Sequence, residues 1–379
     1  PGVPLNRHPI GAAADAAGVP LVGDIELFAQ ARGDLPAHRV VGITGTNGKS
    51  TTTALVHHLL KSAALPTRMG GNIGLPVLGQ EPLAPGGVYV LELSSYQIDL
   101  TQSLECEVTA LLNITPDHLD RYETFENYAA SKARLFAMQR LDQHAVFGMS
   151  DTKTAAIARR ELERRSADVI HRVDGADLLE SQPDWPSLQG PHNLQNAAVA
   201  VAIVEALGLS QAQWRAAMPT FRGLPHRMER VAEANGVLFI NDSKATNPAS
   251  AAPAIAAFPP RPDRGNGKRI HWIVGGLPKG DDLDECKPYF GNVAAAYIIG
   301  DAGPVFAQLL APHMPVRRSE MLIEAVRQAI EAAKPGDIVM LSPACASFDQ
   351  FRDYEARGDA FRQIVEAFTV PDHATGGSA

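Results

Sequence analysis

The stretch Gly42-Ile43-Thr44-Gly45-Thr46-Asn47-Gly48-Lys49-Ser50-Thr51 decides how this chain is organised. It follows a short apolar run at 39–41 and leads into residues 52–56, an order that predicts a strand, a glycine loop and a helix. In such a loop, backbone N–H groups converge on phosphate oxygens, the lysine supplies a mobile cation, and the hydroxyl can ligate Mg²⁺. The common form has a glycine where this chain has Ile43, and Gly45 is extra. The alternative is an ordinary strand, turn and helix with a surface lysine.

The composition limits the classes of function. The chain has 379 residues, of which 45% are hydrophobic, so it can form two or three domains with sizeable cores. Its formal net charge of −8 and its lack of a basic stripe argue against a general nucleic-acid binder. No apolar run is long enough to predict a membrane span, and no signal peptide is visible. Three scattered cysteines without metal-binding spacing favour a reducing cytoplasm.

Apolar runs predict two successive α/β domains with parallel sheets. The first set of strands is expected at residues 40–43, 88–93, 108–113 and 145–147. A boundary is expected near 223–227, after which strands are expected at 237–241, 270–274, 296–299 and 338–341. Helices with one apolar face are expected at 125–136 and 320–333, and an apolar helix at 199–207.

The two ends of the chain are expected to lie outside these domains. Residues 1–36 are too few for a domain, and they predict a helix near 12–17 and a strand at 19–22. Because the chain begins with Pro1 and not with Met, we expect it to be a fragment or a processed product. The tail at 371–379 is expected to be disordered.

Glu92 stands near the carboxyl end of the predicted strand at 88–93. A carboxylate in such an apolar run must be desolvated, and it then needs a cation or hydrogen-bond donors. Ligands of open α/β sheets gather at the carboxyl ends of strands. Glu92 is therefore a candidate Mg²⁺ ligand facing the glycine loop, and the alternative is an exposed position on a half-buried strand.

Two further segments of the first domain carry polar groups in unusual places. The stretch Asn113-Ile114-Thr115-Pro116-Asp117-His118-Leu119-Asp120-Arg121-Tyr122 follows a strand, and its acids and histidine could reach a metal or a phosphate, or could simply cap a helix. Lys132 falls in the middle of the apolar face of the helix at 125–136. A lysine there must extend to solvent, form an ion pair or be modified.

Amides and strand-end loops provide the remaining candidates. Asn193 and Asn196 share one face at a helix start and could contact a base or a ribose, although Asn193 could also be a simple N-cap. In the second domain, small and polar residues follow four strands, at 241–247, 275–280, 300–303 and 342–347. Jointly they predict a cleft whose lysines could bind a substrate carboxylate, whereas each alone could be an ordinary surface loop.

The glycine loop, with Thr44-Gly45-Thr46-Asn47-Gly48-Lys49-Ser50-Thr51, resembles the ATP loop of the Mur ligases. These are cytoplasmic ATP-dependent enzymes that form amide bonds in peptidoglycan synthesis, and their relatives include folylpolyglutamate synthase. Segments at 23–28, 92–97, 117–122, 242–247 and 341–351 are similar to those of the family member that adds D-glutamate to UDP-N-acetylmuramoyl-L-alanine. The resemblance covers almost the whole chain in order, and the last two segments are the most specific.

The resemblance implies roles for individual residues. ATP, with Mg²⁺ as two ions, would be bound by residues of both domains: Gly45, Thr46, Asn47, Gly48, Lys49, Ser50, Thr51, Asn193, Asn196, Arg227 and Asp242. The metal ligands would be Ser50, Glu92, His118 and Lys132, the last as a carbamate that turns its ammonium into a carboxylate-like group. The amino-acid and nucleotide substrates would contact Asn72, Lys244, Thr246, Lys279, Ser347 and Tyr354. Catalytic roles would fall to Lys49, His118 and Lys132.

The resemblance also implies the domain organisation and a reaction. We expect a remnant of an N-terminal UDP-binding domain with its linker at 1–35, a central P-loop ATPase domain with a parallel sheet at 36–226, and a Rossmann-like D-glutamate-binding domain at 227–370. Most of the N-terminal domain is expected to be absent. The substrate carboxylate would attack ATP to give an acyl phosphate, which the amine of D-glutamate would then attack. No nucleic acid or membrane is expected as a partner, and a monomer is expected.

Three alternatives stay open. A ligase similar to folylpolyglutamate synthase also joins glutamate to a carboxylate, but the Ser-Pro-Ala-Cys-Ala-Ser segment at 342–347 argues against it. A non-catalytic ATP-binding remnant should have lost catalytic residues, whereas Lys49, Glu92, His118 and Lys132 are all present. A general P-loop ATPase or kinase would hydrolyse ATP or transfer its phosphate without an amino-acid acceptor.

Overall fold

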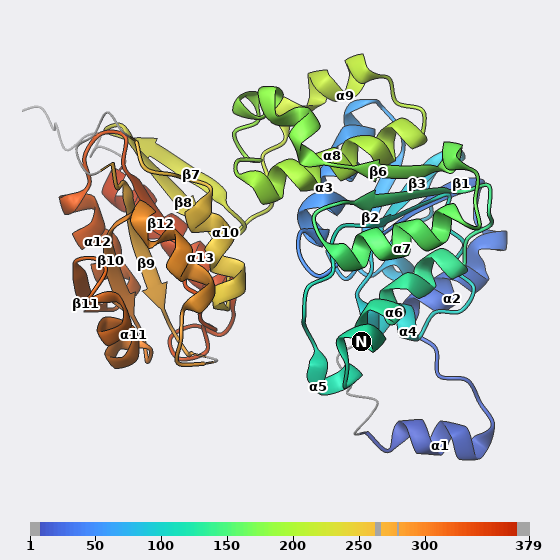
Figure 1. The fold of residues 1–379 in the computed structure, drawn as a ribbon, viewed down its shortest axis with the longest axis horizontal. Helices are drawn as coiled ribbons and strands as arrows, with labels where there is room; N and C mark the ends of the chain where they lie inside the picture. The colour runs from blue at the N-terminus through green and yellow to red at the C-terminus, as the bar shows by residue number, and fades with distance from the viewer. Residues whose placement is uncertain (1–7, 262–266, 279, 370–379) are drawn as a thin grey trace, which may run out of the picture. The chain divides into compact units, whose positions relative to one another are not determined.

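The computed structural model describes residues 8–261, 267–278 and 280–369, without the side chains of Leu119 and Asp120. The chain divides into two compact units, Pro1–Phe221 and Arg222–Ala379, and each contains one six-stranded sheet (Figure 1). The finer domain limits expected from the sequence remain predictions. No helix in the described part of the chain is long and apolar enough to cross a membrane.

The sheet of the first unit is entirely parallel, with the strand order β2-β3-β1-β4-β5-β6. Its strands are β1 His38–Thr44, β2 Thr67–Gly71, β3 Gly87–Glu92, β4 Val108–Leu111, β5 His144–Gly148 and β6 Ile170–Val173. The helices are α1 Ile10–Ala17, α2 Asp24–Ala31, α3 Lys49–Ser62, α4 Ser95–Asp99, α5 Leu119–Tyr122, α6 Phe125–Ala137, α7 Thr152–Leu162, α8 Pro191–Ala206 and α9 Gln211–Ala217.

Helices cover both faces of this sheet, because parallel strands need crossover connections. On one face α2, α6 and α7 contribute to the cores that include Tyr89 and Phe147. On the other face α3 packs against α8 and the strands. Strands β3 and β4 are fully buried and β1 is buried from Val40 onward, which explains why their sequences are mostly apolar.

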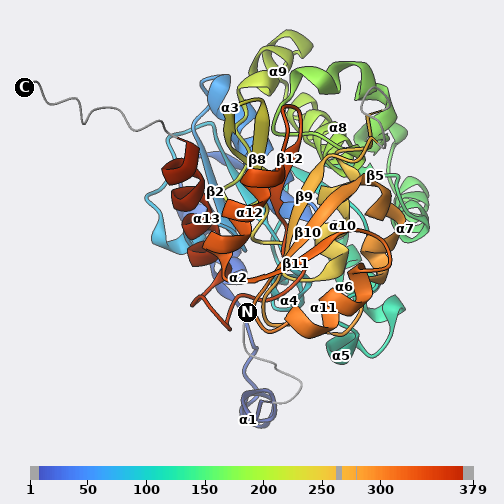
Figure 2. The ribbon, with the colours of Figure 1, turned by 90° about the vertical axis from the view of Figure 1, so that its left-hand side faces the viewer.

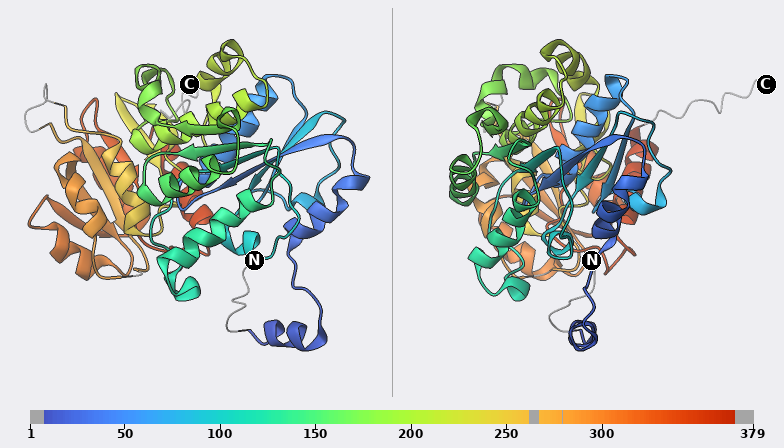
Figure 3. Two further views of the ribbon diagram at one scale, coloured as in Figure 1. Left: turned by 45° about the vertical axis from the view of Figure 1, so that its right-hand side comes forward. Right: turned by 90° about the vertical axis from the view of Figure 1, so that its right-hand side faces the viewer.

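The first residues of the chain differ from the prediction. The expected strand at 19–22 is wrong, since no strand forms there, and residues Asp24–Ala31 form α2. Ile25 and Phe28 of α2 are buried in the core of the first unit, where they pack with Tyr89. Helix α2 therefore belongs to the packed body of this unit, whereas α1 lies apart from that body (Figure 3).

The sheet of the second unit is mixed, with the order β11-β10-β9-β12-β8-β7. Its strands are β7 Glu229–Ala234, β8 Val237–Asn241, β9 Ile270–Gly275, β10 Val293–Ile299, β11 Val316–Glu320 and β12 Ile338–Leu341. Only β7 runs antiparallel, as a hairpin partner of β8 at the edge. The helices are α10 Pro248–Ala256, α11 Gly303–Leu310, α12 Leu322–Ala332 and α13 Tyr354–Thr369, and the 3-10 segment η6 spans Asp284–Asn292.

Alternate residues of these strands form two separate cores. Trp272 and Met340 face α10, α11 and η6, whereas Ile273 and Leu341 face α12 and α13. Figure 2 shows the same arrangement, with α12 and α13 on one side of the sheet and α10 and α11 on the other. The prediction of a P-loop domain with a parallel sheet followed by a Rossmann-like α/β domain is therefore confirmed, with one antiparallel edge strand in the second sheet.

Candidate functional site

The glycine loop lies between β1 and α3, where the sequence predicted it. Gly45 and Gly48 have φ values of 155° and 84°, which suit a residue without a Cβ atom. Asn113, two residues after the end of the neighbouring strand β4, forms two hydrogen bonds with the backbone of Asn47 in the loop. Its Oδ1 accepts from the backbone N–H of Asn47 at 2.9 Å, and its Nδ2 donates to the Asn47 carbonyl at 3.1 Å. No sequence pattern marks Asn113 for this role.

Helix α8 brings an amide against the same loop. Asn196 and Asn193 are both buried, and Nδ2 of Asn196 donates to Oδ1 of Asn193 at 3.3 Å. A Cβ atom at Gly48 would clash with Oδ1 of Asn196, so the two segments touch. The predicted pair of amides therefore lies on one face and contacts the glycine loop, although Asn193 is not the N-cap, a position that Gly190 occupies.

Two lysines converge on one carbonyl of the loop. Nζ of Lys49 donates to the carbonyl oxygens of Gly45 at 3.0 Å and Thr46 at 2.8 Å. Nζ of Lys132, from α6, donates to the same Gly45 oxygen at 2.9 Å. The side chains of Lys49 and Lys132 thus meet at the glycine loop.

Lys132 is buried, with only 1% of its surface exposed, so it does not extend to solvent. Its Nζ lies 4.6 Å from the ring centre of Tyr128. Burial lowers the pKa of Lys132 well below its ordinary value, and the positive charge of Lys49 lowers it further, against smaller opposing effects of Asp117 and Asp99. A lysine with such a pKa can be a neutral amine, which is nucleophilic.

Glu92 ends β3, between Ile43 of β1 and Gly71 of β2, and it is 2% exposed. Its Oε1 accepts from Nδ2 of Asn72 at 3.1 Å, whereas its Oε2 is buried and has no hydrogen-bond partner among the residues that the structure describes. A buried carboxylate oxygen without a donor is unfavourable, and a cation would stabilise it. The alternative of an exposed position is wrong, and Glu92 fits the proposed role of metal ligand. Ser50, at the start of α3, is also buried.

His118 lies in the loop before α5, with 43% of its side chain exposed. Its backbone is left-handed, with φ of 52°, which is uncommon for a residue other than glycine. Nδ1 lies 3.0 Å from the hydroxyl of Tyr96, and Nε2 lies 3.5 Å from Oδ2 of Asp117. Within the described residues, no group of three or more His, Cys, Asp or Glu side chains could alone hold a metal. A metal site here would therefore need other ligands, such as a serine, a modified lysine or phosphate oxygens.

In the second unit, Asp242 directly follows β8 and is buried. Its Oδ2 accepts from Oγ of Ser342 at 2.8 Å, and its Oδ1 accepts from the backbone N–H of Met228 at 3.1 Å. Burial raises the pKa of Asp242 to about 7, although both hydrogen bonds and the charge of Arg227 oppose that rise. Of the residues predicted to contact ATP, Arg227 and Asp242 therefore interact with each other.

The predicted amino-acid contacts gather around α13 and the loops after β8 and β12. Nζ of Lys244 donates to the hydroxyl of Tyr354 at 3.0 Å and lies 4.8 Å from the centre of that ring. The backbone N–H of Thr246 donates to the carbonyl of Lys244, and Ser347 is buried after β12. Lys279 lies outside the described residues.

Arg357 of α13 holds these loops together, a role that its sequence context does not indicate. The side chain is 1% exposed and donates four hydrogen bonds, to Oγ and the carbonyl of Ser243 and to the carbonyls of Cys345 and Ala346, at 2.9 to 3.1 Å. Burial lowers its pKa to about 10. A single arginine in a polar helix gives no sequence signal for this role, because its partners lie far away along the chain.

Backbone hydrogen bonds also join the loops after β9 and β12. The N–H of Leu277 donates to the Ala346 carbonyl at 2.9 Å, and the reciprocal bond is 3.0 Å long. A Cβ atom at Gly276 would clash with the Ala346 carbonyl. Strands β9 and β12 lie where the strand order reverses, which is where open α/β sheets usually leave a crevice for a ligand.

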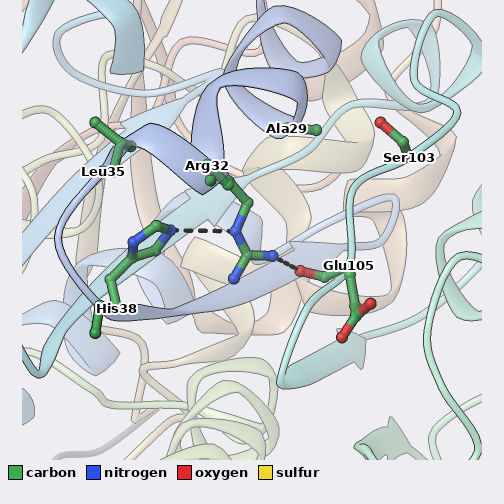
Figure 4. A pocket seen from close by; sticks show the side chains of 8 residues that line it. Ala29, Arg32, Leu35, His38, Ser103 and Glu105 are labelled. Carbon is green, nitrogen blue, oxygen red and sulfur yellow. Dashed lines mark hydrogen bonds between the residues drawn. The ribbon is translucent and has the colours of Figure 1, made fainter.

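One cavity of about 400 Å³ lies at the opposite end of the first sheet, where β1 and β4 begin (Figure 4). Arg32 and His38 point toward each other there, with Nε of Arg32 donating to Nε2 of His38 at 3.1 Å. Arg32 also donates to the Glu105 carbonyl and to Glu107. Because protein groups take up the donors of Arg32, and because the glycine loop lies at the other end of β1, we do not place the active site in this cavity.

Comparison with known proteins agrees with this geometry. The model of the Mur ligase middle domain matches residues 43–204, and that of the Mur ligase glutamate ligase domain matches residues 226–345. The chain belongs to the Mur ligase family. The first match spans Gly45–Thr51 of the glycine loop, Glu92, His118, Lys132 and most of α8 of this Mur ligase, and the second spans Asp242, Ser243 and Cys345.

Relatives within the Mur ligase family are similar over nearly the whole chain. The UDP-N-acetylmuramoylalanine–D-glutamate ligase of Novosphingobium aromaticivorans is 71% identical over 97% of this chain and 81% of its own length. The enzyme of the same name from Sphingopyxis alaskensis is 59% identical over 97% of this chain and 83% of its own length. These matches do not bear out the expectation that the chain lacks most of an N-terminal domain.

Solved structures share the fold at low identity. The MurF ligase of Thermotoga maritima, solved in complex with ADP, has a TM-score of 0.62 at 17% identity and covers 91% of this chain and 84% of its own. The FolC protein of E. coli, in complex with DHPP and ADP, has a TM-score of 0.60 at 18% identity, over 92% of this chain and 94% of its own. Because both score alike, the fold does not separate these activities.

Proposed function

We propose that this Mur ligase is an ATP-dependent enzyme that joins D-glutamate to UDP-N-acetylmuramoyl-L-alanine in peptidoglycan precursor synthesis. The observation that carries the proposal is 71% identity, over 97% of the chain, to a ligase whose name states these substrates. The glycine loop with its two lysines supports ATP use, and so does the ADP bound by the MurF neighbour of the same fold.

The reaction would proceed in two steps. The alanyl carboxylate attacks the γ-phosphorus of ATP, the bond to the bridging oxygen breaks, and an acyl phosphate and ADP form. The amine of D-glutamate then attacks the acyl carbon, the amine loses a proton, and inorganic phosphate leaves. Lys49, at the start of α3, would balance the charge that develops during phosphoryl transfer.

The residues of the first unit would bind ATP and orient it. Backbone N–H groups of the loop from Gly45 to Thr51 would contact the phosphates, as the left-handed glycines and the helix start favour. The buried amides of Asn193 and Asn196 would contact the adenine side. Asn72, which donates a hydrogen bond to Glu92, would contact the nucleotide substrate or the phosphates.

Ser50, Glu92, His118 and a carbamate on Lys132 would hold two Mg²⁺ ions, which screen phosphate charge when bound. The carbamate would form when the neutral amine of Lys132 attacks CO₂, making an N–C bond and releasing one proton. The lowered pKa of Lys132 supports this step, and the orphaned Oε2 of Glu92 supports a cation nearby.

The second unit would supply Arg227 and Asp242 to ATP and would hold D-glutamate through Lys244, Thr246, Lys279, Ser347 and the backbone near Tyr354. The hydrogen bond from Lys244 to Tyr354 supports a joint role for these two residues. We further propose that the enzyme acts in the cytoplasm as a monomer and that neither nucleic acid nor membrane is a partner. The proposed domain limits are at residues 35 and 226.

A phosphate-release assay tests the proposed function. The protein is incubated with ATP and Mg²⁺, either with UDP-N-acetylmuramoyl-L-alanine and D-glutamate or with a folate and L-glutamate. Phosphate release that needs both members of the first pair, and that Lys49→Ala abolishes, is the expected result. No turnover with the first pair contradicts the proposal, turnover with the second pair indicates a folylpolyglutamate synthase-like ligase, and release without an acceptor indicates a plain ATPase.

A further inference from the structure

The side chain of Tyr96 contacts His118 in a way that the proposed reaction does not use. Tyr96 is in α4, four residues after Glu92 at the end of β3, whereas His118 is in the loop before α5. The Tyr96 hydroxyl lies 3.0 Å from Nδ1 of His118, and the two ring centres are 5.0 Å apart. Tyr96 therefore joins the two segments that carry Glu92 and His118.

His118 needs such a partner because its ring is exposed. An exposed histidine side chain can sample several rotamers, and fixing it in one of them reduces its entropy. Its left-handed backbone further indicates that surrounding contacts impose its conformation. The contact with Tyr96 supplies both a hydrogen bond and a ring surface.

Tyr96 also contacts a charged side chain of α5. The guanidinium carbon of Arg121 lies 3.9 Å from the centre of the Tyr96 ring. Nη2 of Arg121 in turn lies 3.5 Å from Oδ2 of Asp99, the last residue of α4. Arg121 of α5 therefore contacts both Tyr96 and Asp99 of α4 and packs against the face of the Tyr96 ring.

Two neighbours bear on which ring nitrogen of His118 can bind a cation: the Tyr96 hydroxyl faces Nδ1, and Oδ2 of Asp117 lies 3.5 Å from Nε2, where a bound cation could contact both. A tyrosine hydroxyl can donate or accept, so it can pair with either form of Nδ1. When Nδ1 carries the hydrogen and donates it to the Tyr96 oxygen, Nε2 keeps its lone pair. Partners that fix the hydrogen of a metal-binding histidine in this way commonly change metal affinity 10- to 100-fold.

We propose that the hydroxyl of Tyr96 is a positioning group that accepts the Nδ1 hydrogen of His118 and so leaves Nε2 for a divalent cation. The proposal rests on the role of His118 in the proposed function.

The variant Tyr96→Phe tests this, because it removes the hydroxyl and keeps the ring under Arg121. The control is Tyr122→Phe, which removes a hydroxyl from the same aromatic cluster but one that bonds to Asp99 at 2.7 Å. The first measurement is the pair of side-chain ¹⁵N shifts of His118 with saturating Mg²⁺ and ADP, assigned by their loss in His118→Gln. The second is Mn²⁺ affinity in the presence of ADP, by electron paramagnetic resonance.

In the wild type, Nδ1 should show the shift of a protonated nitrogen. Tyr96→Phe should mix the two tautomers and weaken Mn²⁺ binding roughly tenfold, whereas Tyr122→Phe should lower the melting temperature and leave both signals unchanged. Wild-type shifts and affinity in Tyr96→Phe overturn the proposal, and so does an equal loss in both variants. Ligase turnover of the wild type is measured separately, so a failure of the proposed function and a failure of the positioning role give different results.

Discussion

Lys132 in the first unit and Arg357 in the second are both cationic residues with 1% of their surface exposed, but their surroundings differ. Lys132 has the Gly45 carbonyl and the face of Tyr128 near its Nζ. Arg357 donates four hydrogen bonds that tie three loop residues to α13. Neither contact set includes a carboxylate, but Lys132 shares the Gly45 carbonyl with a second cation, Lys49.

The difference in contacts indicates a chemical role for Lys132 and a structural role for Arg357. Burial lowers the pKa of both side chains, but a guanidinium whose pKa is about 10 stays charged at neutral pH. The pKa of Lys132 falls well below its ordinary value, so its amine can lose the proton and react. A buried lysine with few partners is therefore a candidate for modification, whereas a buried arginine with many partners indicates a scaffold.

Replacing Lys132 is the strongest test of whether this buried lysine has a chemical role. Lys132→Ala should lower ligase activity by about 10²–10³-fold, because a metal ligand contributes several kcal/mol to the stabilisation of transition-state charge. Short carboxylates in the buffer should partly restore activity if a carbamate is the missing group, and ¹³C-labelled CO₂ should give a carbamate signal in the wild type alone.

Lys132→Arg is the matched control, because it keeps a cation but cannot form a carbamate at neutral pH. It should be as inactive as Lys132→Ala and should not be rescued. Wild-type rates in Lys132→Ala would remove the carbamate argument.

The converse test replaces Arg357. Arg357→Met should lower the free energy of unfolding of the second unit by about 3 kcal/mol, because several buried carbonyls lose their donor. Calorimetry of the protein measures this change. Arg352→Met is the control, since Arg352 is exposed and pairs only with Asp353 in the structure, and its change should stay within about 0.5 kcal/mol. Equal melting temperatures for the two variants would show that Arg357 is not a scaffold residue.

Asp242 is a buried acid whose pKa, like those of Lys132 and Arg357, is shifted by burial. Its pKa in the folded protein is about 7, above the value of about 3.9 for an unfolded chain, so the folded state binds more protons between these values. Its contribution to stability is therefore fully present below pH 4 and is lost as the pH rises through 7. We expect Asp242→Asn to gain about 2 kcal/mol relative to the wild type between pH 5 and pH 8.

Denaturant unfolding at several pH values measures that gain. A constant difference between wild type and Asp242→Asn across this range would show that Asp242 ionises normally.

The smallest expected change in stability concerns the glycine loop, whose Gly45 carbonyl accepts a hydrogen bond from Lys132. Gly48→Ala would force a Cβ atom against Asn196 at a left-handed φ, and it should destabilise the first unit by about 1–2 kcal/mol. Calorimetric titration with ATP should also show weaker binding. Gly79→Ala is the control, because a Cβ atom there meets open space and its backbone is not left-handed. Unchanged ATP binding in Gly48→Ala would indicate that Asn196 and the loop can separate freely.

The sequence predicted the centre of each sheet better than its edges. Strands β1, β3 and β4 are buried on both faces, so their apolar runs are continuous and visible. The edge strands β2, β6 and β11 are only partly buried and contain residues such as Arg68, Arg172 and Arg317, which hide the signal. Strand β7 was missed for the same reason, and with it the antiparallel edge.

In the site, predictions succeeded where burial alone gave the signal. Lys132 and Glu92 stand out because a charge in an apolar pattern needs a reason, and both are buried as predicted. Tyr96, Asn113 and Arg357 could not be found in this way, because their side chains fit many environments. Their roles depend on partners that lie 22, 66 and 114 residues away along the chain.

The pair of backbone hydrogen bonds between Leu277 and Ala346 bears on which other ligands this kind of sheet could take. In many proteins with such a sheet, the gap beside the reversed strands holds a nicotinamide or flavin coenzyme. Here two loops occupy that gap, and Gly276 lets them approach closely. Oxidation–reduction chemistry with such a coenzyme would therefore require new loops in this unit as well as new side chains.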